Sequence, residues 1–166
     1  MEHCHTKNNY RPASNESLNN QAKSYCALLA KRMRKNRIDD NPQNNSKYGF
    51  NIPKVVVACT TDNAPYYVCK GRNNNSLRNP HQTLRAAYPI LRGNGNPLVQ
   101  SIPGVPYYPA GYCAEPHAAN TLLYNMDNHH PIAIEDIRFS LAFKVKNRAV
   151  VPYCGTCRLT FPQLGR

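Results

Sequence analysis

The sequence predicts a single α/β domain, because segments with helical periodicity alternate with segments of strand periodicity and no segment repeats. Its 166 residues suffice for one hydrophobic core and are few for two domains. Residues 1–16 are polar, rich in Asn and without periodicity. We therefore expect them to form a flexible tail at the start of a domain that spans residues 1–166.

The first predicted helix follows this tail. Its apolar residues recur at the spacing of one helix face: Leu18, Ala22, Tyr25, Leu29 and Met33. Its last turns are crowded with basic residues, which the negative end of a helix dipole favours: Lys31, Arg32, Arg34 and Lys35. Contact with phosphates and a solvated helix end explain this basic end equally well.

Two antiparallel strands are predicted next. Residues 54–60 form a β-branched run, residues 61–65 have turn composition, and residues 66–69 form a second apolar run. Cys59 and Cys69 flank the turn, so they would face each other across the hairpin. We expect two buried free thiols there rather than a disulfide.

The second half of the chain alternates loop, helix and strand. Residues 71–111 are rich in Gly, Pro and Asn, with one short helix expected over 81–87, and a long loop of this kind near a site is usually functional. Residues 114–126 read as a helix, residues 137–145 alternate apolar and polar as one strand, and residues 154–164 predict a last helix.

Two groups of cysteines at predicted helix starts form the candidate metal site. Cys113 precedes one helix, and Cys154 and Cys157 open the last one. A helix N-terminus lowers the pKa of a cysteine, and thiolates are favoured zinc ligands. Three protein ligands leave a fourth position for water, which is typical of catalytic zinc. Glu115 is placed to move protons as general acid and base, and charge complementarity with the helix dipole is its alternative role.

Tyr112-Cys-Ala-Glu-Pro-His-Ala-Ala together with Pro152-Tyr-Cys-Gly-Thr-Cys-Arg158 resembles the cytidine deaminase superfamily, whose zinc signature admits three cysteines. The resemblance implies a three-layer α/β/α sandwich with a mixed sheet and the zinc site at two helix N-termini. It implies that Cys113, Cys154 and Cys157 hold Zn²⁺ and that Glu115 is catalytic. The implied reaction is attack of hydroxide on an amine-bearing ring carbon, which would convert cytosine to uracil.

The chain departs from this family in several places. Tyr153 stands before the cysteine pair where the family has proline, and Pro116 follows the glutamate where nucleoside-specific members often carry a basic residue. Three thiolates and Zn²⁺ sum to one negative charge, which His117 or Arg158 would offset. The chain also ends soon after Cys157, where many members continue with further strands, so a smaller sheet is expected.

In its size, charge and loop-rich middle, the chain is similar to the compact deaminase domains of bacterial polymorphic toxins. That likeness rests on general appearance more than on motifs. It implies a toxin or effector domain, with an immunity or inhibitor protein as a further partner.

The net charge favours an anionic substrate. Lys and Arg number 21 against 9 Asp and Glu, which gives a formal charge of +12. This charge favours nucleic acid as the partner, and the alternative is a soluble basic protein whose charge serves no such partner. The segment leading to the site contains five basic residues that we expect in a phosphate groove: Lys70, Arg72, Arg78, Arg85 and Arg92.

Six residues are the expected substrate contacts. Tyr107, Tyr108 and Tyr112 precede the first cysteine and form a candidate base-stacking platform, or else anchor the loop to the core. Asn73 is the first of three asparagines near where related enzymes place a substrate-binding Asn. Ala114 and Tyr153, each beside a zinc ligand, complete this set.

Three classes of function remain open. A zinc deaminase acting on cytosine in DNA, or in RNA, accounts for the charge. A free-nucleoside deaminase needs neither the charge nor the basic loop, and a structural zinc module that binds nucleic acid does not explain Glu115. No apolar run is long enough to span a membrane, so we expect a soluble protein in the cytoplasm of the producing or target cell.

Overall fold

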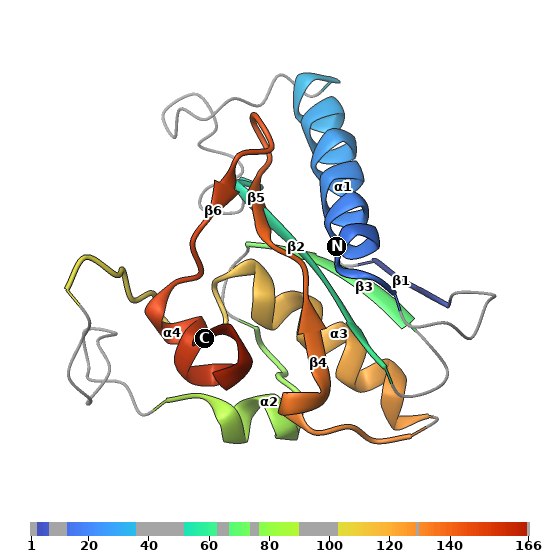
Figure 1. Cartoon of the computed structure of the whole chain (residues 1–166), viewed down its shortest axis with the longest axis vertical. Helices are drawn as coiled ribbons and strands as arrows, with labels where there is room; N and C mark the ends of the chain where they lie inside the picture. Colours follow the sequence, from blue (N-terminus) through green and yellow to red (C-terminus); the bar gives the residue numbers. More distant parts are fainter. Residues whose placement is uncertain are drawn as a thin grey trace.

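The computed structural model describes residues 3–6, 13–35, 52–62, 67–73, 77–89, 103–128 and 130–165. The strands in these ranges are β1 (His3–Thr6), β2 (Val55–Thr61), β3 (Tyr67–Arg72), β4 (Ile137–Phe139), β5 (Ala142–Lys144) and β6 (Val150–Val151). The helices are α1 (Asn15–Lys35), α2 (Gln82–Ala87), α3 (Ala114–Asp127) and α4 (Gly155–Thr160), with 3-10 turns η2 (Ile134–Asp136) and η3 (Pro162–Gly165) (Figure 1).

The strands form one sheet in the order β1-β3-β2-β5-β6, and β4 also pairs with β2. Every pairing among the described residues is antiparallel, so the expected mixed sheet is wrong for this part of the chain. The reason lies in the crossover through α3. It carries the chain from β3 to the opposite side of β2, so β3 and β4 run in the same direction but are separated by β2.

The central strand β2 buries side chains on both faces of the sheet. Val57 and Cys59 pack into a cluster with α3, whereas Val56 and Ala58 pack into a second cluster with α1. This follows from the two-residue repeat of a strand. The sheet therefore carries α1 on one face and α3 on the other (Figure 1), and the predicted α/β class is confirmed.

The predicted first helix is confirmed as α1, and it begins at Asn15 because Ser14 caps it. The Ser14 hydroxyl accepts a hydrogen bond from the backbone nitrogen of Ser17 at 3.0 Å, which satisfies one of the free amides of the first turn. None of the helices in the described ranges is long and apolar enough to cross a membrane.

Part of the expected flexible tail is ordered. His3–Thr6 forms β1 and pairs with β3 in antiparallel register. An unpaired strand edge offers a row of backbone donors and acceptors, and β1 satisfies those of β3. The range expected as a tail, residues 1–16, thus contains β1 and the first residues of α1, which the sequence pattern alone did not reveal.

The strand predicted over residues 137–145 is interrupted at Ser140. Its backbone nitrogen donates to the carbonyl of Ala58 at 2.8 Å, and its hydroxyl accepts from the nitrogen of Ala58 at 2.9 Å. The interruption shifts the two-residue repeat by one position, which reverses the faces. Phe139 therefore packs on the α3 side and Phe143 on the α1 side.

Cys59 and Cys69 are register partners on β2 and β3, as the hairpin predicts. Cys59 is a free thiol, and burial raises its pKa above the usual range. Cys69 is disulfide-bonded, so the expectation of two free thiols is wrong for Cys69. On its other side Cys69 is in register with Cys4 of β1, a third strand that the hairpin prediction did not include.

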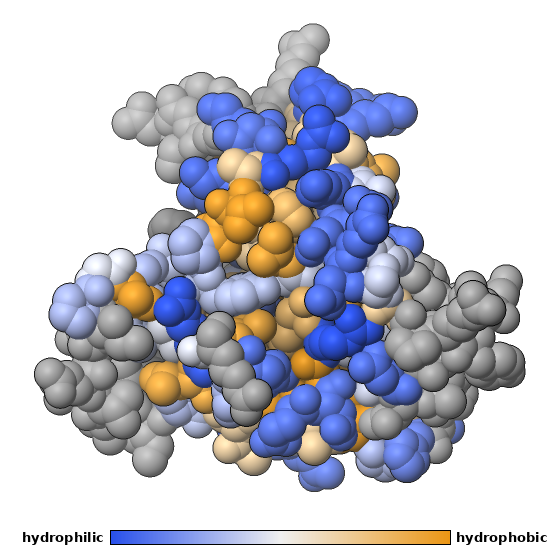
Figure 2. Space-filling model, viewed as in Figure 1, coloured by the Kyte–Doolittle hydropathy of each residue, from blue (hydrophilic) through white to orange (hydrophobic). Residues whose placement is uncertain are grey.

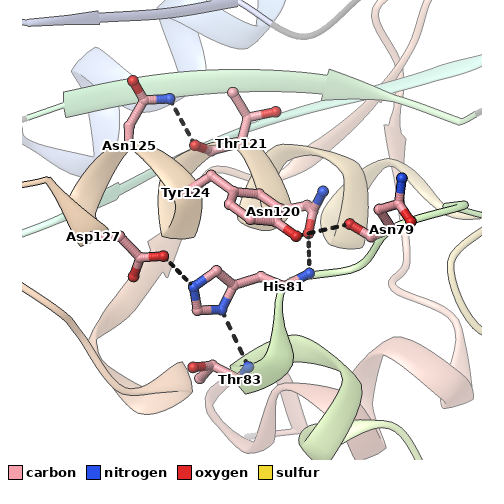
Figure 3. Close-up of polar contacts among 8 residues, drawn as sticks. All are labelled: Asn79, His81, Thr83, Asn120, Thr121, Tyr124, Asn125 and Asp127. Atoms are coloured by element: carbon pink, nitrogen blue, oxygen red, sulfur yellow. Dashed lines mark hydrogen bonds and ion pairs between the residues drawn. The ribbon is translucent and has the colours of Figure 1, made fainter.

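A polar cluster around His81 fastens α2 to the C-terminal half of α3 (Figure 3). The Nδ1 atom accepts from the backbone nitrogen of Thr83 at 3.1 Å, and Nε2 lies 2.7 Å from Asp127 Oδ2. The nitrogen of His81 donates to Asn120 Oδ1 at 2.7 Å, and the Tyr124 hydroxyl donates to a carbonyl of the same loop. Both ring nitrogens therefore serve the packing of α2.

Candidate metal centre

Cys113, Cys154 and Cys157 come together at the start of α3 and α4. Their sulfur atoms all lie within 4.8 Å of one another, and the Sγ atoms of Cys113 and Cys154 are 3.3 Å apart. Cys154 and Cys157 are buried and Cys113 is half-buried. Such a group could hold a metal ion, so the sequence prediction that these three residues converge is confirmed.

Helix geometry explains why the sulfur atoms converge. Cys113 is the N-cap residue of α3 and Cys154 is the N-cap residue of α4, with extended backbone at both positions. The Cys154 sulfur accepts a hydrogen bond from the backbone nitrogen of Cys157 at 3.4 Å. The first turn of α4 therefore directs one amide at the cluster, whereas the Cys113 sulfur accepts no capping bond from α3. The positive end of the α3 dipole also favours negative charge near Cys113.

The three thiols differ in acidity in the metal-free protein. Hydrogen bonds from the side chains of Cys113 and Cys157 lower the pKa of Cys154 below its usual range. The same hydrogen bonds to Cys154 raise the pKa of Cys113 above its usual range, and contacts with Cys113 and Cys154 raise that of Cys157. Cys113 and Cys157 therefore hold their protons more tightly than an ordinary cysteine, and a metal ion that uses all three sulfur atoms must displace these protons.

Glu115 contacts this cluster from the first turn of α3. Its side chain is only 4% exposed, and its Oε2 accepts a hydrogen bond from the Cys157 sulfur at 3.4 Å. Burial raises the pKa of Glu115 to about 7. Among the acidic residues that the structure describes it is the buried one, and a carboxyl that titrates near neutrality is suited to proton transfer.

Gly71 of β3 lets the first turn of α3 lie against the sheet. A Cβ atom at this position would lie 2.4 Å from the backbone nitrogen of Ala118 and 2.7 Å from the carbonyl oxygen of Ala114. The sequence analysis did not identify this residue. A glycine inside a strand is a known signal of close backbone approach, so the signal was present in the sequence.

The loop before Cys113 packs on the start of α4. The nitrogen of Gly155 donates to the carbonyl of Pro106 at 2.7 Å, and the Thr156 hydroxyl donates to the carbonyl of Tyr108 at 2.5 Å. The half-buried Tyr107 ring lies where a side chain at Gly155 would be, which fits the loop-anchor alternative. The side chain of Tyr108 is 51% exposed and available to a ligand.

Three further expected contacts lie beside the ligands. Tyr112 precedes Cys113 and is 41% exposed, whereas Ala114 is buried against β3 and offers a ligand no side-chain surface. The Tyr153 hydroxyl donates to the carbonyl of Ser140 at 2.6 Å. Burial and the nearby charge of Glu115 raise the pKa of Tyr153 to about 12. Tyr153 therefore links the start of α4 to the interruption between β4 and β5.

Asn73 holds the start of β2. Its Oδ1 accepts hydrogen bonds from the nitrogens of Lys54 at 2.7 Å and Val55 at 2.9 Å, and its Nδ2 donates to the carbonyl of Ile52 at 3.2 Å. The polar atoms of the Asn73 side chain are therefore bonded to the backbone before β2 and at its first residue. The neighbouring asparagines of the sequence prediction, 74 and 75, lie outside the described residues.

The described members of the expected basic groove lie on two different parts of the fold. The pleat of β3 points Lys70 away from the face that Gly71 presents to α3, and its Nζ lies 5.9 Å from the centroid of the Tyr25 ring of α1. Arg72 is two positions further along β3 and therefore lies on the same face of the sheet as Lys70. Arg78 and Arg85 are exposed, the first just before α2 and the second within it. The remaining member of the set, residue 92, lies outside the described residues.

Arg158 and His117, which are expected to offset the negative charge of the thiolates, both belong to the helices that carry the cysteines. The Nε of Arg158 donates to the carbonyl of Tyr153 at 3.1 Å, which holds the guanidinium at the start of α4. His117 is buried in the second turn of α3. Compensation of thiolate charge by either residue stays a prediction.

Comparison with known proteins adds no assignment, since no family model, curated protein or solved structure matches this chain.

Proposed function

We propose that the chain is a zinc-dependent hydrolytic deaminase that converts cytosine to uracil in a nucleic acid, with DNA favoured over RNA. The observation that carries the proposal is the contact between the buried Glu115 carboxyl and the Cys157 sulfur of the three-cysteine cluster. A proton-transferring group beside a three-ligand metal site is the arrangement that hydrolytic deamination needs.

The donor set supports zinc. Bonds of about 2.3 Å in a tetrahedral zinc site separate two sulfur ligands by about 3.8 Å. The sulfur atoms here lie within 4.8 Å of one another, so small side-chain adjustments suffice. Sulfur ligands also disfavour Mg²⁺ and Ca²⁺, which prefer oxygen.

The chemistry requires one group that both takes and returns protons. A bound zinc ion would supply Lewis acidity that makes water a nucleophile near neutral pH. Glu115 would take a proton from water as its oxygen adds to C4 of cytosine, and would pass protons to N3 and to the leaving amine. The C–O bond forms, the C–N bond breaks, ammonia leaves and uracil remains.

The arrangement of elements supports a cytidine deaminase-like three-layer sandwich. Helices cover both faces of the sheet, and the candidate ligands lie at the N-termini of two neighbouring helices. The formal charge of +12 supports a polymeric anion over a neutral nucleoside. A toxin or effector role, with an immunity protein as partner, is part of the same proposal.

A second candidate function is a structural zinc module that binds nucleic acid. One observation favours it: the Glu115 Oε2 atom lies 3.4 Å from the Cys157 sulfur, close enough to serve as a fourth ligand. A site with four protein ligands has no open position and no hydrolytic activity.

The test uses the full chain loaded with zinc on four substrates: single-stranded DNA, duplex DNA, RNA and free cytidine. Uracil is measured by mass spectrometry and bound zinc by metal analysis. Glu115→Gln removes the titrating carboxyl while keeping its shape, and Glu135→Gln removes an exposed carboxyl of η2 as the matched control.

We expect the wild type and Glu135→Gln to convert cytosine in a polymer, and Glu115→Gln to lose about 10²- to 10⁴-fold in rate while retaining zinc. Conversion of cytidine alone would replace the polymer by a nucleoside. Absence of all conversion, together with zinc loss in Glu115→Gln, would support the structural module instead.

A further inference from the structure

Exposed basic side chains gather at one end of the molecule, which we call the basic end. On the last turns of α1 these are Lys31, Arg32, Arg34 and Lys35. From the sheet, Lys54 precedes β2, and Lys144 and Arg148 belong to the β5–β6 hairpin. Figure 1 shows the C-terminal end of α1 and this hairpin at the same end of the fold, and Figure 2 shows hydrophilic residues over it.

Contacts join these two parts into one surface. The backbone nitrogen of Val145 donates to the carbonyl of Lys54 at 2.9 Å, which ties the hairpin to the start of β2. The Cys26 sulfur of α1 lies 3.9 Å from the carbonyl of Phe143, and Lys23 Nζ lies 5.4 Å from the Phe143 ring centroid. The relative positions of α1 and the hairpin are therefore set by packing.

Acidic residues are segregated from the basic end. The described segments that form it contain no Asp or Glu, and the intervening residues 36–51 contribute two basic and two acidic residues to the sequence. The exposed acids that the structure describes lie elsewhere: Glu16, Asp62, Asp127, Glu135 and Asp136. Asp62 follows the far end of β2, and η2 leads into Ile137, which pairs with Thr61 at that same end.

A helix dipole does not account for this surface by itself. It favours cations in the last turn of α1, but its effect falls off within that turn. Lys54 precedes β2, Lys144 ends β5 and Arg148 lies between β5 and β6, so none of the three lies on a helix with a comparable dipole. The helix dipole therefore explains only the cations of α1, and the whole surface is wider than the dipole's range.

Arg148 has an unusual backbone conformation in the β5–β6 hairpin. Its φ angle is +59°, in the left-handed region that glycine and asparagine adopt most readily. The hairpin closes around it, with the nitrogen of Arg148 donating to the carbonyl of Lys144 at 2.8 Å. A glycine adopts the same backbone geometry more readily, so Arg148→Gly removes the exposed guanidinium without straining the turn.

We infer that the basic end binds the phosphate backbone of a nucleic acid polymer. Clustered cations from a helix end and a hairpin match the regular negative charge of a polynucleotide, and no acid in the described segments of this surface opposes it. The hairpin leads through β6 to Cys154 over six residues, from 148 to 154. That stretch spans at most about 20 Å, so one polymer can contact both the basic end and the candidate metal centre.

This surface deepens the proposed function and rests on it for the role of the bound polymer, but its test measures binding alone. The measurement is fluorescence anisotropy of a labelled 20-nucleotide single strand with the full chain across a range of salt concentrations. The variants are Arg148→Gly, the double variant Arg32→Gln with Arg34→Gln, and the double variant Arg32→Lys with Arg34→Lys, which keeps both charges, as the control. Thermal unfolding of each variant is recorded in parallel.

Each lost phosphate contact reduces the slope of log affinity against log salt by about 0.7. At 0.1 M salt this corresponds to an affinity that is about fivefold lower. We expect about fivefold weaker binding for Arg148→Gly with an unchanged or higher melting temperature, and about 25-fold for the double variant. Arg32→Lys with Arg34→Lys retains both cations and should bind as the wild type does. Unchanged affinity and salt slope in the basic-end variants would overturn the inference, as would binding to anionic lipid vesicles without binding to the polymer.

Failure of this inference and failure of the proposed function give different results. If Glu115→Gln and the wild type both bind the polymer through the basic end but neither deaminates any substrate, the inference stands and the deaminase proposal falls. If the wild type deaminates DNA and the basic-end variants bind it normally, only the inference falls.

Discussion

The sulfur atom of Cys157 lies 3.4 Å from the Oε2 atom of Glu115, although 42 positions separate the two residues in the chain. The contact joins the first turn of α4 to the first turn of α3 and places a titratable carboxyl beside three cysteines. Because both side chains are buried, protonation, metal binding and folding are linked at this point.

The burial of Glu115 predicts how the stability of the metal-free protein depends on pH. Its pKa is raised from 4.5 to about 7, so between these values the folded state binds more protons than the unfolded state. This contribution to stability is complete below about pH 4.5 and is lost as the pH rises through about 7. Urea unfolding in the presence of chelator should show it, and Glu115→Gln should abolish this part of the pH dependence. Parallel curves for the two proteins would contradict the assignment.

Removal of one cluster sulfur should abolish tight metal binding. Cys113→Ser removes one of three sulfur ligands, so we expect a zinc content well below one ion per chain. We also expect a melting temperature lower than that of the wild type, and added zinc should not raise it. The matched control is Cys59→Ala, which changes a buried free cysteine of the same core outside the cluster. Metal analysis after dialysis measures the outcome, and equal zinc content in the two variants would exclude the cluster as the site.

A methyl group at Gly71 should separate α3 from β3. The added Cβ would lie 2.4 Å from the backbone nitrogen of Ala118, and backbone atoms cannot move aside as a side chain can. Gly71→Ala should cost about 3 kcal/mol in the free energy of unfolding, at the upper end of overpacking effects, and should weaken zinc binding. Gly165→Ala is the control, since its nearest contact is at 3.9 Å. Urea denaturation that shows equal stability for both variants would refute the close approach.

The role of Asn73 can be separated into support of the fold and contact with a substrate. Asn73→Ala loses the hydrogen bonds to Ile52, Lys54 and Val55, so we expect a loss of about 1–3 kcal/mol in stability. Asn73→Asp retains both acceptor bonds and should lie closer to the wild type. Equal activity of folded Asn73→Asp and wild type would indicate a supporting role only, whereas a stable but inactive Asn73→Asp would indicate substrate contact.

Periodicity predicted the elements that local sequence controls. The apolar repeat of α1, the β2–β3 hairpin and the helix after Cys113 all appear where expected, because each depends on residues a few positions apart. Periodicity failed at Ser140, where a side chain bonds to the backbone of the neighbouring strand. Such a bond depends on a partner far away in the chain. The same is true of β1, whose place depends on the free edge of β3.

The sequence by itself determined the chemistry of the candidate site. Residue types and spacings identify Cys113, Glu115, Cys154 and Cys157, and helix starts at 113 and 154 follow from local composition. Only the tertiary structure decided that Glu115 is buried, and hence that its pKa is about 7, because burial depends on the packing of α3, α4 and the sheet. It also joined the cations of α1 and the β5–β6 hairpin into one surface, since residues distant in sequence share a surface only after the sheet brings their elements together.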